Sequence, residues 1–299
     1  MPGLTITWLP DAQPRERHLA VGEFDGVHIG HREVIRGADT VLTFEPHPRA
    51  VVAPHAAPKL LTTLAAKADL VERLGVEELV VIPFDGAFSQ RSAQEFIDHV
   101  LIDQLGAAEV SVGENFHFGH KARGNPALLA AQDAFTTHVV GLVEVDGEVV
   151  TSTNIRRLVS EGDVRQAGRL LGAPFGLRGE VMHGDKRGRD LGFPTANLVP
   201  DDKLVYPGHG IYACRATVQV DGEWRSAPAA TSIGVRPTFV TGRGVLVEAY
   251  LLDFDADLYG RELRLDFLER LRGEQRFDSA EALMEQMARD VEATRRIAA

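Results

Sequence analysis

The run Gly172-Ala173-Pro174-Phe175-Gly176 divides the sequence into two halves with different hydrophobic patterns. Up to about Leu171, short apolar runs alternate with segments of helical spacing, which is typical of βαβ units and a parallel sheet. After this run, strand-like segments alternate with turn signals, which indicates a mostly antiparallel sheet or a small barrel. The length of 299 residues also fits two domains of roughly 100–200 residues each. We therefore expect one domain over residues 1–172 and a second over residues 173–299.

Several elements of the first half can be predicted individually. Apolar runs at residues 18–22, 40–44, 78–82 and 110–113 indicate strands, and residues 63–74 have helical spacing. Ser92 and Glu95 form a capping-box pattern, which predicts that a helix begins there. The stretch between His31 and Thr43 leaves room for barely two helical turns before Gly37.

The second half has strand and hairpin signals. Residues 216–220 and 245–252 have strand patterns, and the Asp221-Gly222 pair predicts a tight hairpin turn. A long helix closes the chain, with Asp278 or Ser279 as its cap and Leu283, Met287 and Val291 on one stripe.

Composition limits the classes of function. The formal net charge of −11 disfavours general nucleic-acid binding, which needs a basic surface. The single cysteine, Cys214, excludes an internal disulfide framework and a cysteine-rich zinc site. No apolar stretch approaches the roughly 20 residues that span a bilayer, and the first residues lack an apolar signal core. We expect a soluble cytoplasmic protein without nucleic-acid or membrane partners; the sequence does not indicate its oligomeric state.

The segment Gly22–His31 directly follows the first predicted strand. In open α/β sheets, ligands bind beyond the carboxyl ends of strands. His28 and His31 are three residues apart, so on the first turn of a helix both rings can face one point. Gly26 and Gly30 allow a bulky ligand to approach the backbone, and a helix N-terminus favours phosphate. Imidazoles placed there could stabilise charge that develops on a phosphate.

Other interpretations of these segments remain open. His28 and His31 could be zinc ligands, with His47 or His55 completing the site, although a structural zinc site needs four good ligands. Residues 151–156 could hold phosphates through hydroxyls and a guanidinium, or simply cap a helix. Residues 113–119 offer an amide and aromatic rings after another strand, but such an aromatic pair is usually part of a core.

A glycine-rich basic segment lies in the second half, at residues 183–197. No Walker-type phosphate loop occurs anywhere in the sequence, so a kinase of that class is excluded. Backbone N–H groups and basic side chains of such a segment can hold phosphates, although a solvated turn would have the same composition. Thr195 and Asn197 offer oxygen ligands that suit Mg²⁺.

Taken together and in order, these segments resemble the prokaryotic bifunctional riboflavin kinase/FMN adenylyltransferase family, also called FAD synthetases. Gly22–His31 is similar to the HxGH segment of nucleotidylyltransferases, and residues 151–156 are similar to their Ser/Thr-Arg segment. Residues 43–48 and 113–124 add to this likeness. In the second half, Gly192–Asn197 is similar to the GxPTAN element of riboflavin kinases, as are residues 232–239 and 247–260. The likeness extends from about His18 to the C-terminal helix.

The resemblance implies a nucleotidylyltransferase-like, Rossmann-like α/β domain followed by an antiparallel riboflavin kinase-like β-barrel with a terminal helix. It implies ATP-dependent phosphorylation of riboflavin to FMN, and then adenylylation of FMN to FAD with release of pyrophosphate. The implied substrates are riboflavin, FMN and ATP, and Mg²⁺ is the implied cofactor. For the adenylyltransferase, it implies catalytic roles for His28 and His31, ATP binding at Gly22, Phe24, Asp25, Gly30, Ser152, Thr153 and Arg156, and flavin binding at Asn115 and Phe116.

For the kinase, the resemblance implies that Glu248 is the base for the ribityl hydroxyl. It further implies ATP binding at Gly184, Lys186, Gly188, Thr195 and Asn197, a metal at Thr195 and Asn197, and flavin binding at Arg272 and Phe277. An alternative is a chain with riboflavin kinase activity only, whose N-terminal domain is a non-catalytic scaffold or flavin-binding regulator. The short connection between His31 and Thr43 bears on this alternative, because relatives usually have a full crossover helix there. We expect adenylylation to survive this shortening and the first domain to be less stable than the second.

Overall fold

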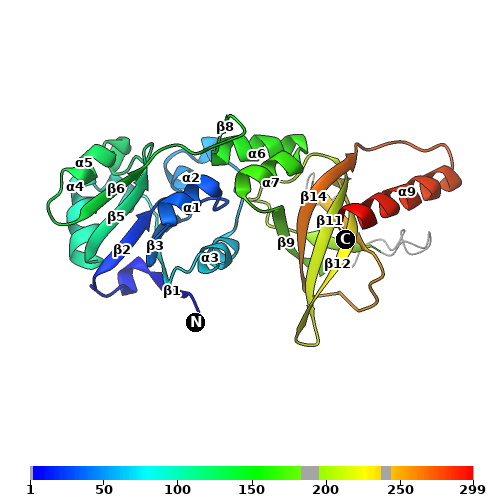
Figure 1. Ribbon diagram of the computed structural model, residues 1–299, viewed down its shortest axis with the longest axis horizontal. Helices are drawn as coiled ribbons and strands as arrows, with labels where there is room; N and C mark the ends of the chain where they lie inside the picture. Colours follow the sequence, from blue (N-terminus) through cyan, green and yellow to red (C-terminus); the bar gives the residue numbers. More distant parts are fainter. Residues whose placement is uncertain (1–2, 183–194, 237–243, 299) are drawn as a thin grey trace. The chain divides into compact units, whose positions relative to one another are not determined.

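In the computed structural model, residues 3–182, 195–236 and 244–298 are described. The chain forms two compact units, Met1–Ser152 and Thr153–Ala299. The first contains a parallel α/β sheet, and the second contains a closed antiparallel barrel and a long terminal helix (Figure 1). Both fold classes predicted from the sequence are confirmed.

The first unit is built on a six-stranded sheet in which all neighbouring strands are parallel. The strands are β1 (Thr5–Trp8), β2 (Arg17–Val21), β3 (Thr40–Glu45), β4 (Glu78–Pro83), β5 (Ala107–Gly113) and β6 (Thr136–Val140). Their order is β1-β4-β3-β2-β5-β6, so the chain adds β3 and β4 on one side of β2 and later β5 and β6 on the other. In open α/β sheets such a reversal marks the edge where ligands bind, here at the carboxyl ends of β2 and β5.

Helices cover both faces of this sheet (Figure 1). They are α1 (Ile29–Ile35), α2 (Pro48–Val52), α3 (Leu64–Glu72), α4 (Ala93–Glu95), a π-helix (Phe96–Gln104) and α5 (Pro126–Ala130). Val41 and Val81 belong to a buried cluster with α1 and α3, whereas their neighbours Leu42 and Ile82 belong to a second cluster with the π-helix. Because both faces are buried, the strands are continuous apolar runs, which is why the sequence predicts them.

Short elements complete the first unit. They are the 3-10 turns Leu9–Asp11, Pro54–Ala56, Phe88–Gln90 and His120–Ala122, and a ribbon of β7 (Glu144–Val145) and β8 (Glu148–Val149). The predicted capping box is present: Glu95 N donates to Ser92 Oγ at 3.1 Å, and Ser92 N donates to Glu95 Oε2 at 2.7 Å. Helix α1 has seven residues, about two turns, and Gly37 beyond it has a φ of 80°. The short crossover is therefore confirmed.

The second unit is a closed barrel in the order β10-β13-β12-β11-β14-β9, and β9 pairs with β10 to close it. Its strands are β9 (Phe175–Met182), β10 (Ala196–Val199), β11 (Gly210–Val220), β12 (Glu223–Arg236), β13 (Gly244–Leu251) and β14 (Glu262–Arg272). The predicted hairpin turn separates β11 from β12, and Asp221 and Gly222 have φ of 53° and 85°, as a type I′ turn requires. Buried Tyr212 and Phe267 meet edge to face at 5.4 Å in the core.

Two helices, α6 (Ser152–Glu161) and α7 (Val164–Leu171), precede the barrel, and α7 packs against β9 and β14. The turn between them is closely fitted to the barrel. Gly208 N donates to Val159 O at 3.1 Å, and a Cβ at Gly162 would lie 2.7 Å from the Tyr212 hydroxyl. Residues from Thr153 onward therefore form one compact unit with the barrel.

The terminal helix α9 (Ala280–Ala298) packs against β11, β12 and β14. Ser279 caps it, because its hydroxyl accepts from Ala282 N at 3.2 Å. Asp290, Thr294 and Ala298 are its buried residues. Within the described ranges, no helix combines the length and apolar character needed to cross a membrane.

Candidate functional sites

The loop that follows β2 has an unusual backbone. Phe24 and Val27 have φ of 48° and 42°, and Gly26 has a φ of 88°. A left-handed conformation at a non-glycine residue costs on the order of 1–3 kcal/mol and persists only where the surroundings enforce it. Here burial does so, because Phe24 is 2% exposed and Val27 is 1% exposed. Such strain concentrates at functional sites.

Asp25 fixes the centre of this loop. Its carboxylate accepts hydrogen bonds from Leu61 N at 2.9 Å and from Thr62 N at 3.0 Å. Its backbone carbonyl accepts from the Ser152 hydroxyl at 2.9 Å. Two residues that the sequence associates with ATP binding, Asp25 and Ser152, are thus in contact at the start of α6.

His28 and His31 lie together at the N-terminus of α1. The rings stack at 3.5 Å between centroids with 18° between their planes, and Phe24 meets His31 edge to face at 5.3 Å. His28 caps the helix, because its Nδ1 accepts from His31 N at 3.2 Å. With Nδ1 as the acceptor, the neutral ring carries its proton on Nε2. The arrangement therefore places a fixed imidazole tautomer at the carboxyl edge of β2.

The glycines beside this pair are explained by aromatic rings of the chain itself. A Cβ at Gly30 would lie 3.3 Å from the His28 ring, and a Cβ at Gly22 would lie 3.1 Å from the Phe24 ring. Both contacts are tighter than ordinary packing, so larger residues would displace the rings.

An imidazole–carboxylate pair lies just beyond the neighbouring strand β3. His47 Nε2 is 2.6 Å from Glu23 Oε2, and His47 Nδ1 accepts from Arg49 N at 3.1 Å. The ring joins the loop after β2 to the start of α2. From the sequence, His47 is expected only as a residue that could complete a zinc site with His28 and His31. Its position within the motif at residues 43–48 was the signal that could have placed it beside Glu23.

Asn115 and Phe116 follow β5, the strand on the other side of β2. Asn115 is exposed, whereas Phe116 is half-buried and stacks on Phe118 at 5.5 Å with 18° between the rings. Phe118 in turn meets Phe96 at 5.4 Å. The chain of rings continues through Phe88 and Phe84 to Phe44 at the end of β3. This aromatic chain thus begins at Phe116, one of the two predicted flavin-binding residues.

The Ser/Thr-Arg segment opens α6. Ser152 and Arg156 are four residues apart on this helix, so they lie on one face, and Thr153 is exposed in the first turn. Arg156 is half-buried.

In the barrel, the short strand β10 brings Asn197 opposite Glu248 on β13, and Glu248 is also opposite Ser232 on β12. Directly opposed residues of antiparallel strands have Cβ atoms about 4.5–5.5 Å apart and point to the same face. Asn197 is 8% exposed, and Glu248 is half-buried. The predicted kinase base and one predicted metal ligand are therefore neighbours. The predicted ATP-binding residues Gly184, Lys186 and Gly188 lie outside the described residues.

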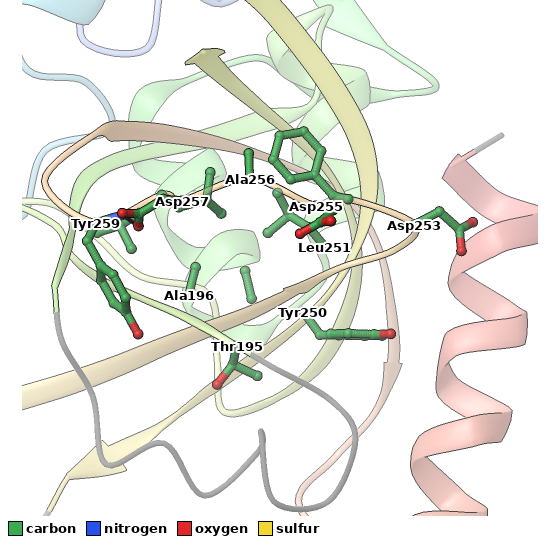
Figure 2. Close-up of a pocket in the computed structure, with 13 residues that line it drawn as sticks. Thr195, Ala196, Tyr250, Leu251, Asp253, Asp255, Ala256, Asp257 and Tyr259 are labelled. Carbon is green, nitrogen blue, oxygen red and sulfur yellow. Dashed lines mark hydrogen bonds between the residues drawn. The ribbon is translucent and has the colours of Figure 1, made fainter. Parts of the chain in front are cut away.

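A cavity of about 750 Å³ lies beside these strands. Thr195 and Tyr250 line it together with the segment Asp253–Tyr259, which follows β13. Figure 2 shows Thr195, Tyr250 and Tyr259 on one side of the pocket, and Asp255 and Ala256 across from them. The sequence alone assigns no role to this segment, although it lies within the motif at residues 247–260.

Arg272 and Phe277, predicted to contact flavin, lie together at the end of β14. The Arg272 guanidinium is 5.8 Å from the centre of the Phe277 ring. It also donates to both carboxylate oxygens of Asp290 on α9, from Nη2 to Oδ2 at 2.7 Å and from Nε to Oδ1 at 3.2 Å. Asp290 is 6% exposed, so this bidentate pair fixes the guanidinium plane.

The described residues contain no group of three or more His, Cys, Asp and Glu side chains that could hold a metal ion. His28 Nδ1 is moreover engaged with the His31 backbone. The geometry therefore gives no support to a zinc site at the histidine pair.

Comparison with known proteins places both units in described families. Residues 11–154 match the family model for FAD synthetase, and residues 171–298 match the model for riboflavin kinase. A bifunctional riboflavin kinase/FMN adenylyltransferase from Pseudomonas fluorescens is 39% identical over 98% of this chain and 97% of its own length. The protein of the same name from Listeria monocytogenes is 37% identical over 93% of this chain and 91% of its own.

The fold also matches a solved structure over nearly the whole chain. The crystal structure described as a macrolide-efflux protein from Streptococcus pneumoniae superimposes with a TM-score of 0.87. It is 31% identical, and the match covers 97% of this chain and 98% of that one.

Proposed function

The chain belongs to the bifunctional riboflavin kinase/FMN adenylyltransferase family, and from this membership we propose how its residues carry the two reactions. In the first reaction, riboflavin and ATP give FMN and ADP. In the second, FMN and another ATP give FAD and pyrophosphate. We assign the second reaction to residues 1–172 and the first to residues 173–299.

The stacked pair of His28 and His31 is the observation that carries the adenylyltransferase assignment. An oxygen of the FMN phosphate attacks the α-phosphorus of ATP, and the bond to pyrophosphate breaks. Negative charge grows on the oxygens of the transferring group, and preorganised N–H donors stabilise it. His28 suits this role because its Nδ1 is fixed as an acceptor, which leaves the proton on Nε2. Gly22, Phe24, Asp25 and Gly30 shape the loop that presents the ring.

Departing pyrophosphate needs cationic and hydroxyl partners. We assign these to Ser152, Thr153 and Arg156, because a guanidinium and hydroxyls at the start of a helix bind phosphate oxygens well. Ser152 donates a hydrogen bond to the Asp25 carbonyl, and this contact supports a shared role in ATP binding for Ser152 and the loop after β2.

The flavin of FMN requires an apolar, aromatic surface. Phe116, stacked on Phe118, offers a ring face beside Asn115, whose amide can hydrogen-bond the polar edge of a flavin. Their position after β5, next to β2, supports binding of FMN near the histidine pair.

For the kinase, the pairing of Glu248 with Asn197 carries the assignment. The Glu248 carboxylate accepts the proton of the terminal ribityl hydroxyl as its oxygen attacks the γ-phosphorus of ATP. Arg272 and Phe277 contact the flavin, and Asp290 holds the Arg272 guanidinium in position.

Mg²⁺ fits the donor set that these strands provide. Thr195 and the buried Asn197 supply neutral oxygens, and the Glu248 carboxylate lies opposite Asn197. Mg²⁺ prefers oxygen ligands and is usually held by few protein groups together with substrate phosphates. Thr195 and Asn197 would hold it, and when bound it neutralises phosphate charge.

The cavity beside Thr195 is our candidate for the nucleoside part of ATP. Tyr250 and Tyr259 supply aromatic surface, and Leu251 supplies aliphatic surface. Because Thr195 lines the cavity and belongs to the proposed phosphate site, one nucleotide could contact both. Both reactions use ATP, which fits the cytoplasmic location that the sequence predicts.

A flavin conversion assay tests the proposal. The protein is incubated with riboflavin and Mg²⁺-ATP, and riboflavin, FMN and FAD are separated by chromatography. We expect FMN first and FAD later, with ADP and pyrophosphate in matching amounts. Formation of FMN without FAD would favour the kinase-only alternative. Formation of neither would overturn the proposal.

A further inference from the structure

Lys67 is a buried cation that the mechanism above does not use. It lies on α3 and is 6% exposed, on the same helix face as Ala68 and Val71. Burial of an ammonium group is costly unless the group is paired and hydrogen-bonded. The position of Lys67 therefore requires specific partners.

These partners join the loop after β2 to β3. Lys67 Nζ donates to the Glu23 carbonyl at 2.6 Å and to Thr43 Oγ1 at 3.0 Å. Thr43 Oγ1 donates to the same Glu23 carbonyl at 3.1 Å. The three groups form a closed triangle between α3, β3 and the loop.

Carboxylates near the triangle offset part of the cost of burying the ammonium group. Burial lowers the pKa of Lys67, while the charges of Asp25, Glu45 and Glu23 act in the opposite direction. The carboxylates themselves are held, since Glu23 pairs with His47 and Asp25 accepts from the Leu61 backbone. The ammonium thus lies inside a fixed set of charges at the carboxyl edge of the sheet.

The triangle acts at the beginning of the strained loop. Glu23 immediately precedes Phe24, whose φ is 48°, and the loop continues to His28, the cap of α1. Asp25 anchors the middle of the loop, and the triangle anchors its start. A loop in an unfavourable conformation relaxes when an anchor is removed, because packing no longer enforces it.

We propose that Lys67 is a positioning residue for adenylyl transfer, which holds the loop from Glu23 to His28 and thereby the stacked rings of His28 and His31. This inference rests on the proposed function of that pair. Lys67 touches neither reactant; it acts through the Glu23 carbonyl. Misplacement of catalytic groups by about 1 Å can cost 100-fold in rate, so the effect falls on kcat.

The test uses Lys67→Met in the full chain, because methionine keeps most of the apolar stem and removes the ammonium. We expect kcat for FAD formation to fall about 10- to 100-fold, with KM for ATP changed less than about threefold. Riboflavin kinase activity in the same sample should stay unchanged. Arg73→Met is the matched control, since it removes an exposed cation from the end of the same helix. An unchanged kcat for FAD formation in Lys67→Met would overturn the inference.

Histidine ring NMR separates positioning from loss of folded protein. In Lys67→Met, the ring signals of His28 and His31 should shift because their stack changes, whereas those of the exposed His99 should not. Unfolding of the unit would move all of them. If FAD formation survives His28→Ala with His31→Ala, the proposed function fails, whatever these shifts are. If that double variant is inactive but Lys67→Met leaves the His28 and His31 signals in place, only the present inference fails.

Thr43→Val decides the matter should Lys67→Met not fold. Valine has nearly the volume of threonine but lacks the hydroxyl, so the variant loses two sides of the triangle and keeps only the hydrogen bond from Lys67 to the Glu23 carbonyl. We expect a several-fold loss of kcat for FAD formation and a shift of the His28 signal. Wild-type values for both would overturn the inference.

Discussion

Asn197 on β10 lies directly opposite Glu248 on β13, so an amide and a carboxylate from distant parts of the sequence share one face of the barrel. The pairing follows from barrel closure, in which the short strand β10 lies between β9 and β13. It joins the proposed base for the ribityl hydroxyl to a proposed ligand of Mg²⁺.

Replacement of this carboxylate should separate the two activities. Glu248→Gln keeps the size and hydrogen-bonding capacity of the side chain but removes the basic oxygen, which contributes typically 10²–10⁴-fold as a general base. We expect FMN formation from riboflavin to fall by at least about 100-fold, while FAD formation from supplied FMN stays near the wild-type rate. Initial rates with riboflavin and with FMN provide the measurement. Equal loss of both activities would contradict the two-site assignment.

Replacement of the histidine pair should have the opposite effect, with loss of FAD formation and retention of FMN formation. His28→Ala with His31→Ala removes both stacked rings and should stop FAD formation, while FMN formation continues. Each single variant should lose about 10²–10³-fold, as is typical for removal of one donor to a developing oxyanion. Metal analysis is the control, because stoichiometric zinc in the wild type that is lost in the double variant would refute the phosphate role.

Motif segments were predicted from the sequence because their chemistry is local. The Gly22–His31 segment directly follows an apolar run, which indicates a loop after a strand, and the Asp221-Gly222 pair favours the positive φ of a tight turn. In both cases a few adjacent residues are enough to predict the local structure. Capping residues such as Ser92 are equally local.

Contacts between distant segments could not be predicted in the same way. The pairing of Glu23 with His47 and the burial of Lys67 depend on how β2, β3 and α3 pack, and a lysine in a helical pattern is usually exposed. The register of β10 against β13 likewise depends on closure of the whole barrel. The close fit of Gly162 to Tyr212 leaves no local signal beyond a glycine after a helix.

That fit leads to a stability prediction with a built-in control. Gly162 and Gly222 have nearly equal φ, 86° and 85°, but a Cβ at Gly162 would lie 2.7 Å from the Tyr212 hydroxyl, whereas nothing lies within 4 Å at Gly222. Gly222→Ala should cost only backbone strain, about 1–2 kcal/mol. Gly162→Ala should cost more, because the barrel must also move. Thermal unfolding of both variants can be monitored through the loss of riboflavin kinase activity. Equal unfolding midpoints for Gly162→Ala and Gly222→Ala would refute the packing argument.

The first unit should lose stability in acid through Glu78. Burial alone would raise the pKa of Glu78, but hydrogen bonds from Arg17 and Thr7 and the charges of Arg17 and Arg15 hold it below its ordinary value. Since the folded-state pKa is the lower one, the stabilisation is present above the ordinary value, about 4.3, and is lost as pH falls through the folded-state pKa. Glu78→Gln should cost about 3–5 kcal/mol at pH 7, because Arg17 is 2% exposed and would keep an unpaired charge.

Tryptophan fluorescence can report this effect for the first unit alone. The chain has two tryptophans, Trp8 in the first unit and Trp224 in the second, so Trp224→Phe leaves Trp8 as the probe. Urea unfolding of Glu78→Gln in this background should differ from its parent at pH 7 much more than at about pH 3. The neighbouring exposed Glu77 gives the matched control, Glu77→Gln. A pH-independent difference between Glu78→Gln and its parent would be the contrary result.

Hydrogen exchange should show that the first unit opens more readily than the barrel. Helix α1 has only seven residues, of which Val34 and Ile35 are buried, and Gly37 prevents its extension. A short crossover buries little apolar area, and each Å² not buried forgoes about 25 cal/mol. By contrast, β13 is hydrogen-bonded on both edges and buries Val247 and Ala249 completely. Peptides that cover residues 21–44 should therefore exchange faster than those that cover residues 245–252, and FAD formation should nevertheless persist, because the short helix retains the His28–His31 end. Slower exchange in residues 21–44 would show that the anchors at Glu23 and Asp25 outweigh the shortened helix.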